Sequence, residues 1–538
     1  MERRNFIRLI GTVGSAFLIL PQLVSCSEKR KSISTKILGA NKKRGHLLRD
    51  NKLSNLQTVK KIEIDTIIVG GGITGLSCAY HLAKNNYTDF LLLEMNERTG
   101  GNSDSGENEF SKFPLGAHYL TLPNPQNRTL IEFLKENQLL TKENKDGTQE
   151  YSEEHLCHAP DERLLHRGVF QEGFVPSYGV PEKQNEEIIR FFLLMEEMKK
   201  EKGSDGKFLF DIPLTSASKD TKLLDYDKIS FEQYLHDNNF NSDELNWFLD
   251  YCCRDDFGAG LDRVSAWSGI NYFAGRKSNP SNTIPSNVLT WPEGNGFLVD
   301  ILKEKSKNQI RTGIAVTKIE EYESHSMIIA FDFSKNENIL IKAKKVIVSS
   351  PSYVTKHILK SNYWNESDFE NYIHHPWLVS IVVLDKIPVG SGLDLAWDNV
   401  KFGTKGLGYI NNQHQEFNQH KDKHVISVYL AFDKEGDVKE RQKMFSLTEE
   451  EMKQLVLQEL NGIHPTIEEH IESISFQQWG HGMVTPYPNS LATHYDFIEK
   501  NGKSPIIRLA HTDYSGYSIF EEGFSQGIES ANFIIKNS

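Results

Sequence analysis

Cysteine, net positive charge and long hydrophobic runs are all scarce in this sequence. It has 5 cysteines in 538 residues, without Cys-x-x-Cys spacing, so we expect neither a disulfide framework nor a zinc or other metal site. The formal net charge is -12, which argues against nucleic acid as a partner because phosphate recognition needs a basic surface. The N-terminal apolar stretch, residues 9–20, is too short to span a bilayer.

The composition is that of a large folded protein. Hydrophobic residues make up 38% and aromatic residues 10% of the chain, which is enough for a sizeable core. A length of 538 residues exceeds that of one ordinary domain. We find no internal repeat, so the chain is expected to fold as a few large domains.

The first 26 residues are typical of an export signal. Arg3 and Arg4 precede Phe6 and the apolar stretch 9–20, and this pattern resembles the twin-arginine signal, a route for proteins already folded around a cofactor. An ordinary secretory signal is the alternative, because basic residues suffice there.

Leu23-Val24-Ser25-Cys26 comes next and resembles a bacterial lipobox; a cleavage site with a coincidental cysteine is the alternative. Lipidation of Cys26 with several acyl chains would give stable anchoring. We therefore expect an exported, membrane-anchored bacterial lipoprotein on the periplasmic or cell-surface side. Residues 27–61 are polar and Lys-rich and are expected to be a tether, of which residues 45–49 are specific enough to dock on the body.

A dinucleotide site is predicted directly after this region. The β-branched run 65–69 is typical of a buried strand. Gly70 permits a tight turn, Gly72 lets the backbone approach a pyrophosphate, and Gly75 lets helix and strand pack closely. Ile73 and Thr74 begin the helix, whose free N–H groups and dipole favour phosphate.

A second strand, residues 90–93, ends at Glu94. That position lies 94 − 75 = 19 residues after the last glycine, where an acid accepts the ribose hydroxyls. Strand, glycine turn, helix, second strand and acid in this order make the motif far more specific than the glycines alone.

The segment from Glu94 to Asn102 resembles the acid–Arg–Gly-Gly signature of the flavoprotein amine oxidase superfamily, which includes protoporphyrinogen oxidases and carotenoid desaturases. The resemblance continues to the C-terminus and implies FAD as the cofactor. It further implies Val316 at the adenine, Asp513 at a ribityl hydroxyl and a closing helix over residues 523–532 at the flavin; His511 departs from the glycine that is common there. The residues assigned to the cofactor through this resemblance are Arg98, Gly100, Gly101, Asn102, Val316, Asp513, Gly527 and Ile528.

These motifs fall in three blocks, which implies an α/β fold: a discontinuous Rossmann-type FAD-binding domain with an interleaved α+β substrate domain. We expect residues 62–120, 285–351 and 477–538 to form the FAD-binding domain. Residues 121–284 and 352–476 then form the substrate domain.

Four residues are expected beside the flavin: His118, Trp479, His481 and Tyr487. A histidine there can act as a base or steer the substrate, although a structural role is an equal alternative. Many amine oxidases carry a lysine on a substrate-domain strand; the matching strand, residues 376–384, has Ser380 near that position.

Three functions remain open at this stage. The first is an FAD-dependent oxidoreductase that oxidises a small organic substrate, an amine or polyamine, by hydride transfer to the flavin, with oxygen or a quinone as electron acceptor. The second is a desaturase or isomerase of a hydrophobic, lipid-like substrate. The third is a non-enzymatic, FAD-stabilised binding protein. Acids beside aromatic cavity walls would favour the amine, and the cluster from Arg254 to Asp256 is the candidate; an apolar cavity would favour the lipid.

Overall fold

The computed structural model describes residues 32–39, 42–53, 58–416 and 422–537. The expected export signal, with Arg3, Arg4 and Cys26, lies outside the described residues. Residues from Ile33 onward form one compact unit. Within the described ranges, no helix is both long and apolar enough to cross a membrane.

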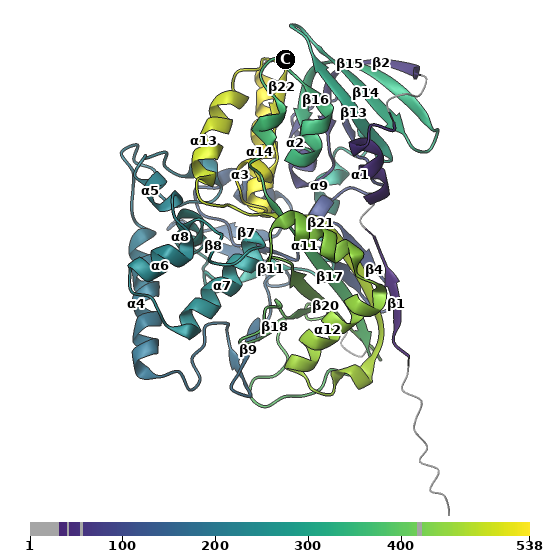
Figure 1. Ribbon diagram of the computed structural model, residues 1–538. Coiled ribbons are helices and arrows are strands. Elements are labelled where there is room, and N and C mark those ends of the chain that lie inside the picture. Colours follow the sequence, from purple (N-terminus) through teal and green to yellow (C-terminus); the bar gives the residue numbers. More distant parts are fainter. Residues whose placement is uncertain (1–31, 40–41, 54–57, 417–421, 538) are drawn as a thin grey trace, which may run out of the picture. The chain divides into compact units, whose positions relative to one another are not determined.

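The first large sheet carries the dinucleotide motif and lies with α2 and α14 in Figure 1. Its central strands are parallel, because β2 pairs with β3 on one side and with β15 on the other. Antiparallel strands extend it beyond β15. The strand order is β12 (Ile310–Arg311), β3 (Phe90–Leu93), β2 (Thr58–Val69), β15 (Glu337–Val348), β14 (Ser326–Asp332), β13 (Ile314–Glu321) and β16 (Leu359–Lys360), with β22 (Ile507–Leu509) also on β15.

Helices cover this sheet with apolar faces. Helices α2 (Ile73–Lys84) and α14 (Phe520–Lys536) pack against each other. The two helices approach closely at Gly527, where a Cβ would lie 2.4 Å from the Thr74 carbonyl oxygen. Further helices around the sheet are α3 (Arg128–Glu136), α9 (Gly296–Glu304), α10 (Ser352–Ile358) and α13 (Ser490–Asn501).

The second large sheet is mostly antiparallel. Its order is β1 (Ser34–Ile37), β21 (Ile471–Val484), β17 (His374–Leu384), β20 (His424–Ala431), β19 (Tyr409–Asn411), β18 (Asp398–Lys401), β9 (Glu162–His166) and β10 (Val169–Glu172). Three two-stranded sheets complete the strands: β11 (Val288–Thr290) with β6 (Tyr119–Thr121), β4 (Ser105–Glu107) with β5 (Lys112–Pro114), and β7 (Leu140–Glu143) with β8 (Gln149–Tyr151).

Both faces of the second sheet are buried. Leu378 and Val382 of β17 pack on the side of α11 (Asp437–Ser446) and α12 (Glu449–Ile463). Trp377 and Val379 point to the opposite face, as the alternation of a strand requires. That face is covered by α4 (Glu182–Met198), α5 (Leu223–Asp227), α6 (Phe231–Asp237), α7 (Asp243–Phe257) and α8 (Ala266–Ala274).

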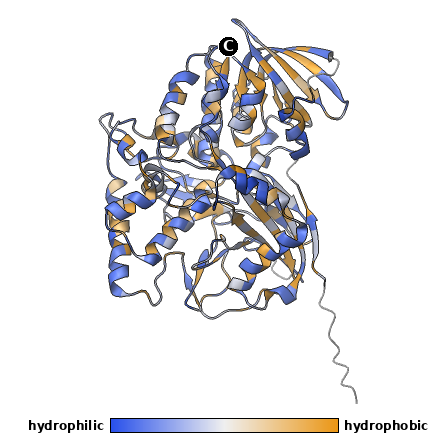
Figure 2. Ribbon diagram, in the orientation of Figure 1, coloured by the Kyte–Doolittle hydropathy of each residue, from blue (hydrophilic) through white to orange (hydrophobic). Residues whose placement is uncertain are grey.

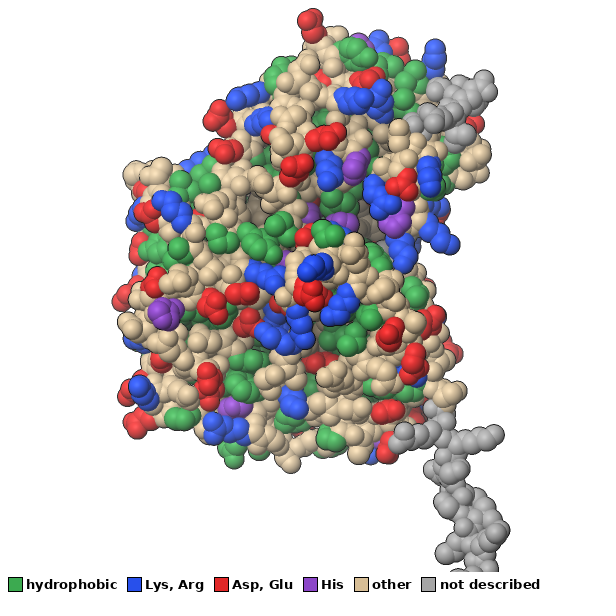
Figure 3. All heavy atoms as spheres, viewed as in Figure 1, with side chains coloured by type: hydrophobic (Ala, Val, Ile, Leu, Met, Phe, Trp, Pro, Cys, Tyr) green, Lys and Arg blue, Asp and Glu red, His purple; other side chains and the backbone are tan. Residues whose placement is uncertain are grey.

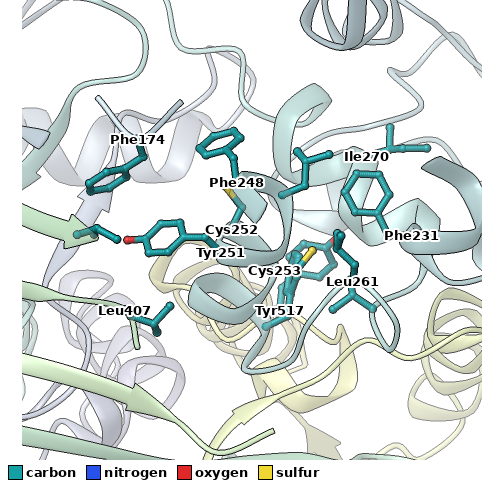
Figure 4. Packing of buried hydrophobic residues seen from close by; sticks show 14 of the residues in the cluster. Phe174, Phe231, Phe248, Tyr251, Cys252, Cys253, Leu261, Ile270, Leu407 and Tyr517 are labelled. Carbon is teal, nitrogen blue, oxygen red and sulfur yellow. The ribbon is translucent and has the colours of Figure 1, made fainter. Parts of the chain in front are cut away.

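Figure 4 shows the core on that face, where Tyr251, Cys252 and Cys253 of α7 pack among Phe174, Phe231 and Phe248. In Figure 2 the strands are largely hydrophobic, whereas the outer helices carry hydrophilic residues. Burial of this apolar surface is the main force that holds the helices on the sheets.

The α/β fold with a Rossmann-type sheet and a second, interleaved sheet is confirmed. The domain limits differ in detail from those expected from sequence. The described parts of residues 27–61 form β1, α1 (Lys42–Arg49) and the start of β2. Strand β21 runs through the expected limit at residue 477 and lies wholly in the second sheet, while α10 and β16 follow residue 351 but stay with the first sheet.

Candidate active site

A long cavity lies where the parallel strands of the first sheet end. Its volume is about 1410 Å³, including its opening to solvent. The ends of β2, β3 and β15 contribute residues 69–74, 93–96 and 349–351 to its wall. Ligands of open α/β sheets bind at this edge.

The glycine turn shapes the wall as predicted for a phosphate site. Gly70 has a φ of +106°, and a Cβ there would lie 2.8 Å from the Ser349 carbonyl oxygen. A Cβ on Gly75 would lie 2.0 Å from the Gly70 carbonyl oxygen, so only glycine lets α2 start this close to the turn. At Gly72, by contrast, a Cβ would meet no atom within 4 Å, so the backbone there is open to a ligand.

Glu94 is held by backbone donors at the end of β3. Its Oε2 accepts the Gly71 N–H at 2.7 Å, and its Oε1 accepts the Asn96 N–H at 2.7 Å. Burial raises the pKa of Glu94, and these two hydrogen bonds oppose the rise. The carboxyl group therefore sits fixed in the cavity wall beside the glycine turn.

Most of the residues assigned to the cofactor line this cavity. They are Gly70, Gly72, Ile73, Thr74, Glu94, Gly100, Gly101, Asn102, Val316 and Asp513.

Four assigned residues do not line it, and one of them, Gly75, packs against the Gly70 turn as described above. Arg98 is exposed; its Nη2 lies 2.7 Å from Asp104 Oδ2, so the structure directs it to a surface ion pair. Gly527 serves the contact between α14 and α2, and Ile528 is buried in the core beneath the sheet. The end of α14 that reaches the cavity is its first residue, Phe520.

Asp513 is surrounded by protein groups. Its Oδ2 accepts the N–H and the hydroxyl of Ser352 at 2.7 and 2.8 Å. Its Oδ1 lies 2.9 Å from His374 Nε2 and 3.0 Å from His511 Nδ1. Burial by itself would raise the pKa of Asp513, but the two imidazoles hold it well below its ordinary value. His511, which stands where a glycine is common in the superfamily, therefore adds an imidazole contact to Asp513.

A second cavity of about 780 Å³ adjoins the first. The two share Ala117, Trp479, Gly482 and Ile519 in their walls. Trp377 and Trp479 are register partners on β17 and β21, and Val379 is the partner of Tyr429 on β20. Adjacent strands thus present their aromatic rings to one side, where they form a wall. On the face shown in Figure 3, histidine side chains lie at a hollow between the upper and lower parts.

Carboxylates lie beside this aromatic wall. Asp255 and Asp256, at the end of α7, and Glu521, in the first turn of α14, line the second cavity. Arg276 Nη2 donates to Asp256 Oδ2 at 2.7 Å. Burial, followed by the neighbouring Asp256, raises the pKa of Asp255 to about 7. The cavity therefore holds one acid paired with a guanidinium and another that ionises near neutrality.

Both predicted histidines reach the cavities. His118 lines the second cavity and packs against Tyr119 and Tyr429, with ring centroids 5.0 and 4.7 Å away. His481 lines the first cavity and stacks on Tyr353 at 3.7 Å. Burial lowers the pKa of His118 to about 4 and that of His481 to about 2. Both are therefore neutral at physiological pH.

The aromatic candidates separate into two groups. Trp479 lines both cavities and its Nε1 donates to the Leu115 carbonyl oxygen at 2.5 Å. Tyr487 lies in a separate surface depression and stacks on His375. Ser380 faces away from the cavity, because Trp377 and Val379 are the residues of β17 that line it. Strand β17 has no lysine, and none lines either cavity among the described residues.

Several wall residues were missed from sequence: Tyr119, Arg276, Trp377, Tyr429 and Glu521. They come from separate parts of the chain, and none stands in a local motif. Only Tyr119, which follows His118 in the chain, had a signal that could have marked it.

The family follows from comparison with known proteins. A family model described as flavin containing amine oxidoreductase matches residues 73–535. The chain belongs to this family. It is therefore an FAD-dependent oxidoreductase, and the prediction of FAD as the cofactor is confirmed.

Solved structures share its fold. Putrescine oxidase bound to putrescine is 16% identical, with a TM-score of 0.63 over 88% of this chain and 100% of that one. Cyclohexylamine oxidase from Brevibacterium oxydans is 14% identical, with a TM-score of 0.61 over 88% of this chain and 99% of that one. A fatty acid isomerase from P. acnes is 15% identical, with a TM-score of 0.60 over 88% and 98%.

Curated relatives match over shorter segments. L-amino acid oxidase from Cerastes cerastes is 28% identical over 120 residues, 22% of each chain. Mitochondrial dimethylglycine dehydrogenase from Homo sapiens is 47% identical over 47 residues, 9% of this chain and 5% of that one. These matches span about a fifth or less of the relatives' length.

The residues of the first cavity fit FAD. The open backbone at Gly72 and the start of α2 suit a pyrophosphate. Glu94 stands where ribose hydroxyls are accepted. The junction with the second cavity, at Ala117 and Trp479, is where a flavin ring would meet a substrate.

Proposed function

We propose that this enzyme oxidises a cationic amine, a monoamine or a polyamine, that binds in the second cavity. The observation that carries the proposal is the half-buried Asp255, which lies with Tyr119, Trp377 and Tyr429 in one cavity wall. An ammonium group is attracted both to a carboxylate and to the faces of aromatic rings.

The chain's own residues supply binding and orientation. FAD, when bound, accepts a hydride from the carbon beside the amine nitrogen. Asp255 attracts the ammonium group, and the aromatic wall of Trp377 and Trp479 excludes water and orients the alkyl chain. His118, neutral and on the same wall, is positioned to orient the amine.

A lipid-like substrate is the alternative. Its apolar chain would offer no cation to Asp255, the acid of this wall that is not in the ion pair with Arg276, and burial of an unpaired charge is costly. The acids therefore favour the amine. The names of the putrescine and cyclohexylamine oxidases, which share the fold, are consistent with that choice.

Binding can be tested without turnover. tert-Butylammonium has no hydrogen on the carbon beside nitrogen and resists oxidation, and tert-butanol is its neutral counterpart of similar shape. Titration of the oxidised enzyme at pH 8, followed by the visible spectrum of the flavin, should give an affinity for the amine at least about tenfold higher than for the alcohol. Equal affinities would contradict the proposal.

We also propose that the enzyme is exported and anchored to a membrane through lipidated Cys26. The proposal rests on the sequence around Arg3, Arg4 and residues 23–26. Cys26→Ser should move the enzyme from the membrane fraction to the soluble fraction. An unchanged distribution would rule out this anchor.

A further inference from the structure

The short helix α1 (Lys42–Arg49) packs against the cofactor cavity, although it precedes the segment that the family model matches. That match begins at residue 73, whereas Leu48 of α1 lines the first cavity together with Glu94, Met95 and Val316. This end of the cavity surrounds the acid that accepts ribose hydroxyls, so Leu48 faces the adenosine half of the dinucleotide site.

Arg44 ties α1 to the loop that follows Glu94. Its Nη1 donates to the Met95 carbonyl oxygen at 2.8 Å, and its Nη2 pairs with Glu97. Its guanidinium also lies over the Phe333 ring, 4.2 Å from the centroid. The side chain is 17% exposed, so these contacts are shielded from solvent more than those of an ordinary surface arginine.

The same loop positions the ribose acid. The Asn96 N–H donates to Glu94 Oε1 at 2.7 Å, and the Gly313 N–H donates to the Asn96 carbonyl oxygen at 2.8 Å. Arg44 holds this loop through its hydrogen bond to Met95, the residue between Glu94 and Asn96. A shift of the loop would move the Glu94 carboxyl away from its place in the wall.

Apolar contacts hold the rest of the segment. Leu47 packs with Met95 and Phe333, and Leu53, just beyond α1, is 5% exposed against Ala315 and Phe331. Helix α1 also contacts α10. The segment from Lys42 to Leu53 is therefore docked along its length on the elements that form one end of the cavity.

We propose that α1 is a part of the FAD site that lies outside the family segment: Leu48 closes the adenosine end of the cavity, and Arg44 holds the loop that carries Glu94. The proposal rests on FAD binding and does not depend on which substrate is oxidised.

The test is the FAD affinity of the full-length apoprotein, measured by quenching of flavin fluorescence. Arg44→Ala should weaken FAD binding about tenfold, because hydrogen bonds from a charged group to the loop are lost. Leu48→Ala should weaken it about fivefold through lost apolar contact. Lys43, which is exposed on the same helix, gives the matched control Lys43→Ala, which should bind FAD like the wild type.

Two results would overturn the proposal. One is wild-type FAD affinity in both Arg44→Ala and Leu48→Ala. The other is a loss of affinity accompanied by a fall in the melting temperature of the apoprotein, which would assign α1 to the stability of the fold. Hydrogen exchange provides a second measurement on the wild type: FAD should slow the exchange of residues 42–53, and unchanged exchange would contradict direct closure of the site.

Discussion

Arg276 donates from Nη2 to Asp256 Oδ2 at 2.7 Å, and this ion pair does not include the adjacent Asp255, which also lines the second cavity. Tyr119 is the nearest hydroxyl donor, 3.5 Å from Asp255 Oδ2. Arg276 is the one Arg or Lys in the wall of this cavity among the described residues. The arrangement separates a neutralised acid from one that is available to a cation.

The first prediction concerns Asp255. Asp255→Asn should raise the KM for the amine by a factor of about 30 or more, because a buried charge pair loses one partner, while the FAD content stays unchanged. Asp243, exposed at the start of the same helix, provides the control Asp243→Asn, which should have wild-type KM. Steady-state kinetics of both variants measure KM. An unchanged KM in Asp255→Asn would show that Asp255 does not bind the substrate.

The second prediction concerns pH. The pKa of Asp255 is raised to about 7, so the carboxyl is neutral below that pH and charged above it, while an alkylamine stays cationic to about pH 10. kcat/KM for the amine should therefore rise about tenfold per pH unit below 7 and level off above it. Burial also raises the pKa values of Glu162 and Asp398, and the nearby Asp255 adds to both shifts.

Asp255→Asn serves as the control for this pH dependence. The variant should lose most of the rise between pH 6 and pH 7. A wild-type kcat/KM that falls as pH rises would show that another group titrates. The same conclusion would follow if Asp255→Asn kept the wild-type pH dependence of kcat/KM.

The third prediction concerns the cofactor. Glu94→Ala should weaken FAD binding by about 1.5–3 kcal/mol while the rate of the FAD-loaded enzyme changes little, because Glu94 lines only the first cavity, whereas Trp479 lines both. Equilibrium titration of the apoprotein with FAD measures the first quantity and single-turnover reduction the second. Wild-type affinity would mean that Glu94 does not hold the ribose.

The fourth prediction concerns the two histidines. His118→Asn or His481→Asn should slow flavin reduction by a factor of about 10 to 1000, the usual contribution of acid–base or orienting groups. The pH profile near neutrality should persist, because burial holds the pKa of His118 at about 4 and that of His481 at about 2. Wild-type rates in both variants would make the histidines structural and leave the chemistry to the Asp255 region.

The dinucleotide site could be predicted from the sequence because phosphate binding depends on local backbone geometry. Gly70 and Gly75 follow a strand and precede a helix, and the close contacts that require glycine lie within a few residues of each other. Glu94 ends the next strand along the chain. These glycines and the acid therefore stand at a fixed spacing in the sequence, and that spacing predicts the site.

The residues of the second cavity show no comparable spacing in the sequence. Trp377, Tyr429 and Trp479 meet because β17 lies between β20 and β21, and a register between strands so far apart in the chain is set by tertiary packing. A displacement of one residue reverses the face of a strand, and the sequence alone does not show that Val379, and not its neighbour Ser380, lines the cavity. Tyr487 was likewise assigned from its neighbourhood in the chain.

Anaerobic flavin reduction tests the central claim most directly. Purified enzyme is mixed without oxygen with putrescine, cyclohexylamine, a neutral alcohol of similar size or an unsaturated fatty acid, and the visible absorbance of the flavin is followed. An amine should bleach the flavin, Asp255→Asn should require a much higher amine concentration, and the alcohol and the fatty acid should leave the flavin oxidised. Bleaching by the fatty acid with none by either amine would contradict the account.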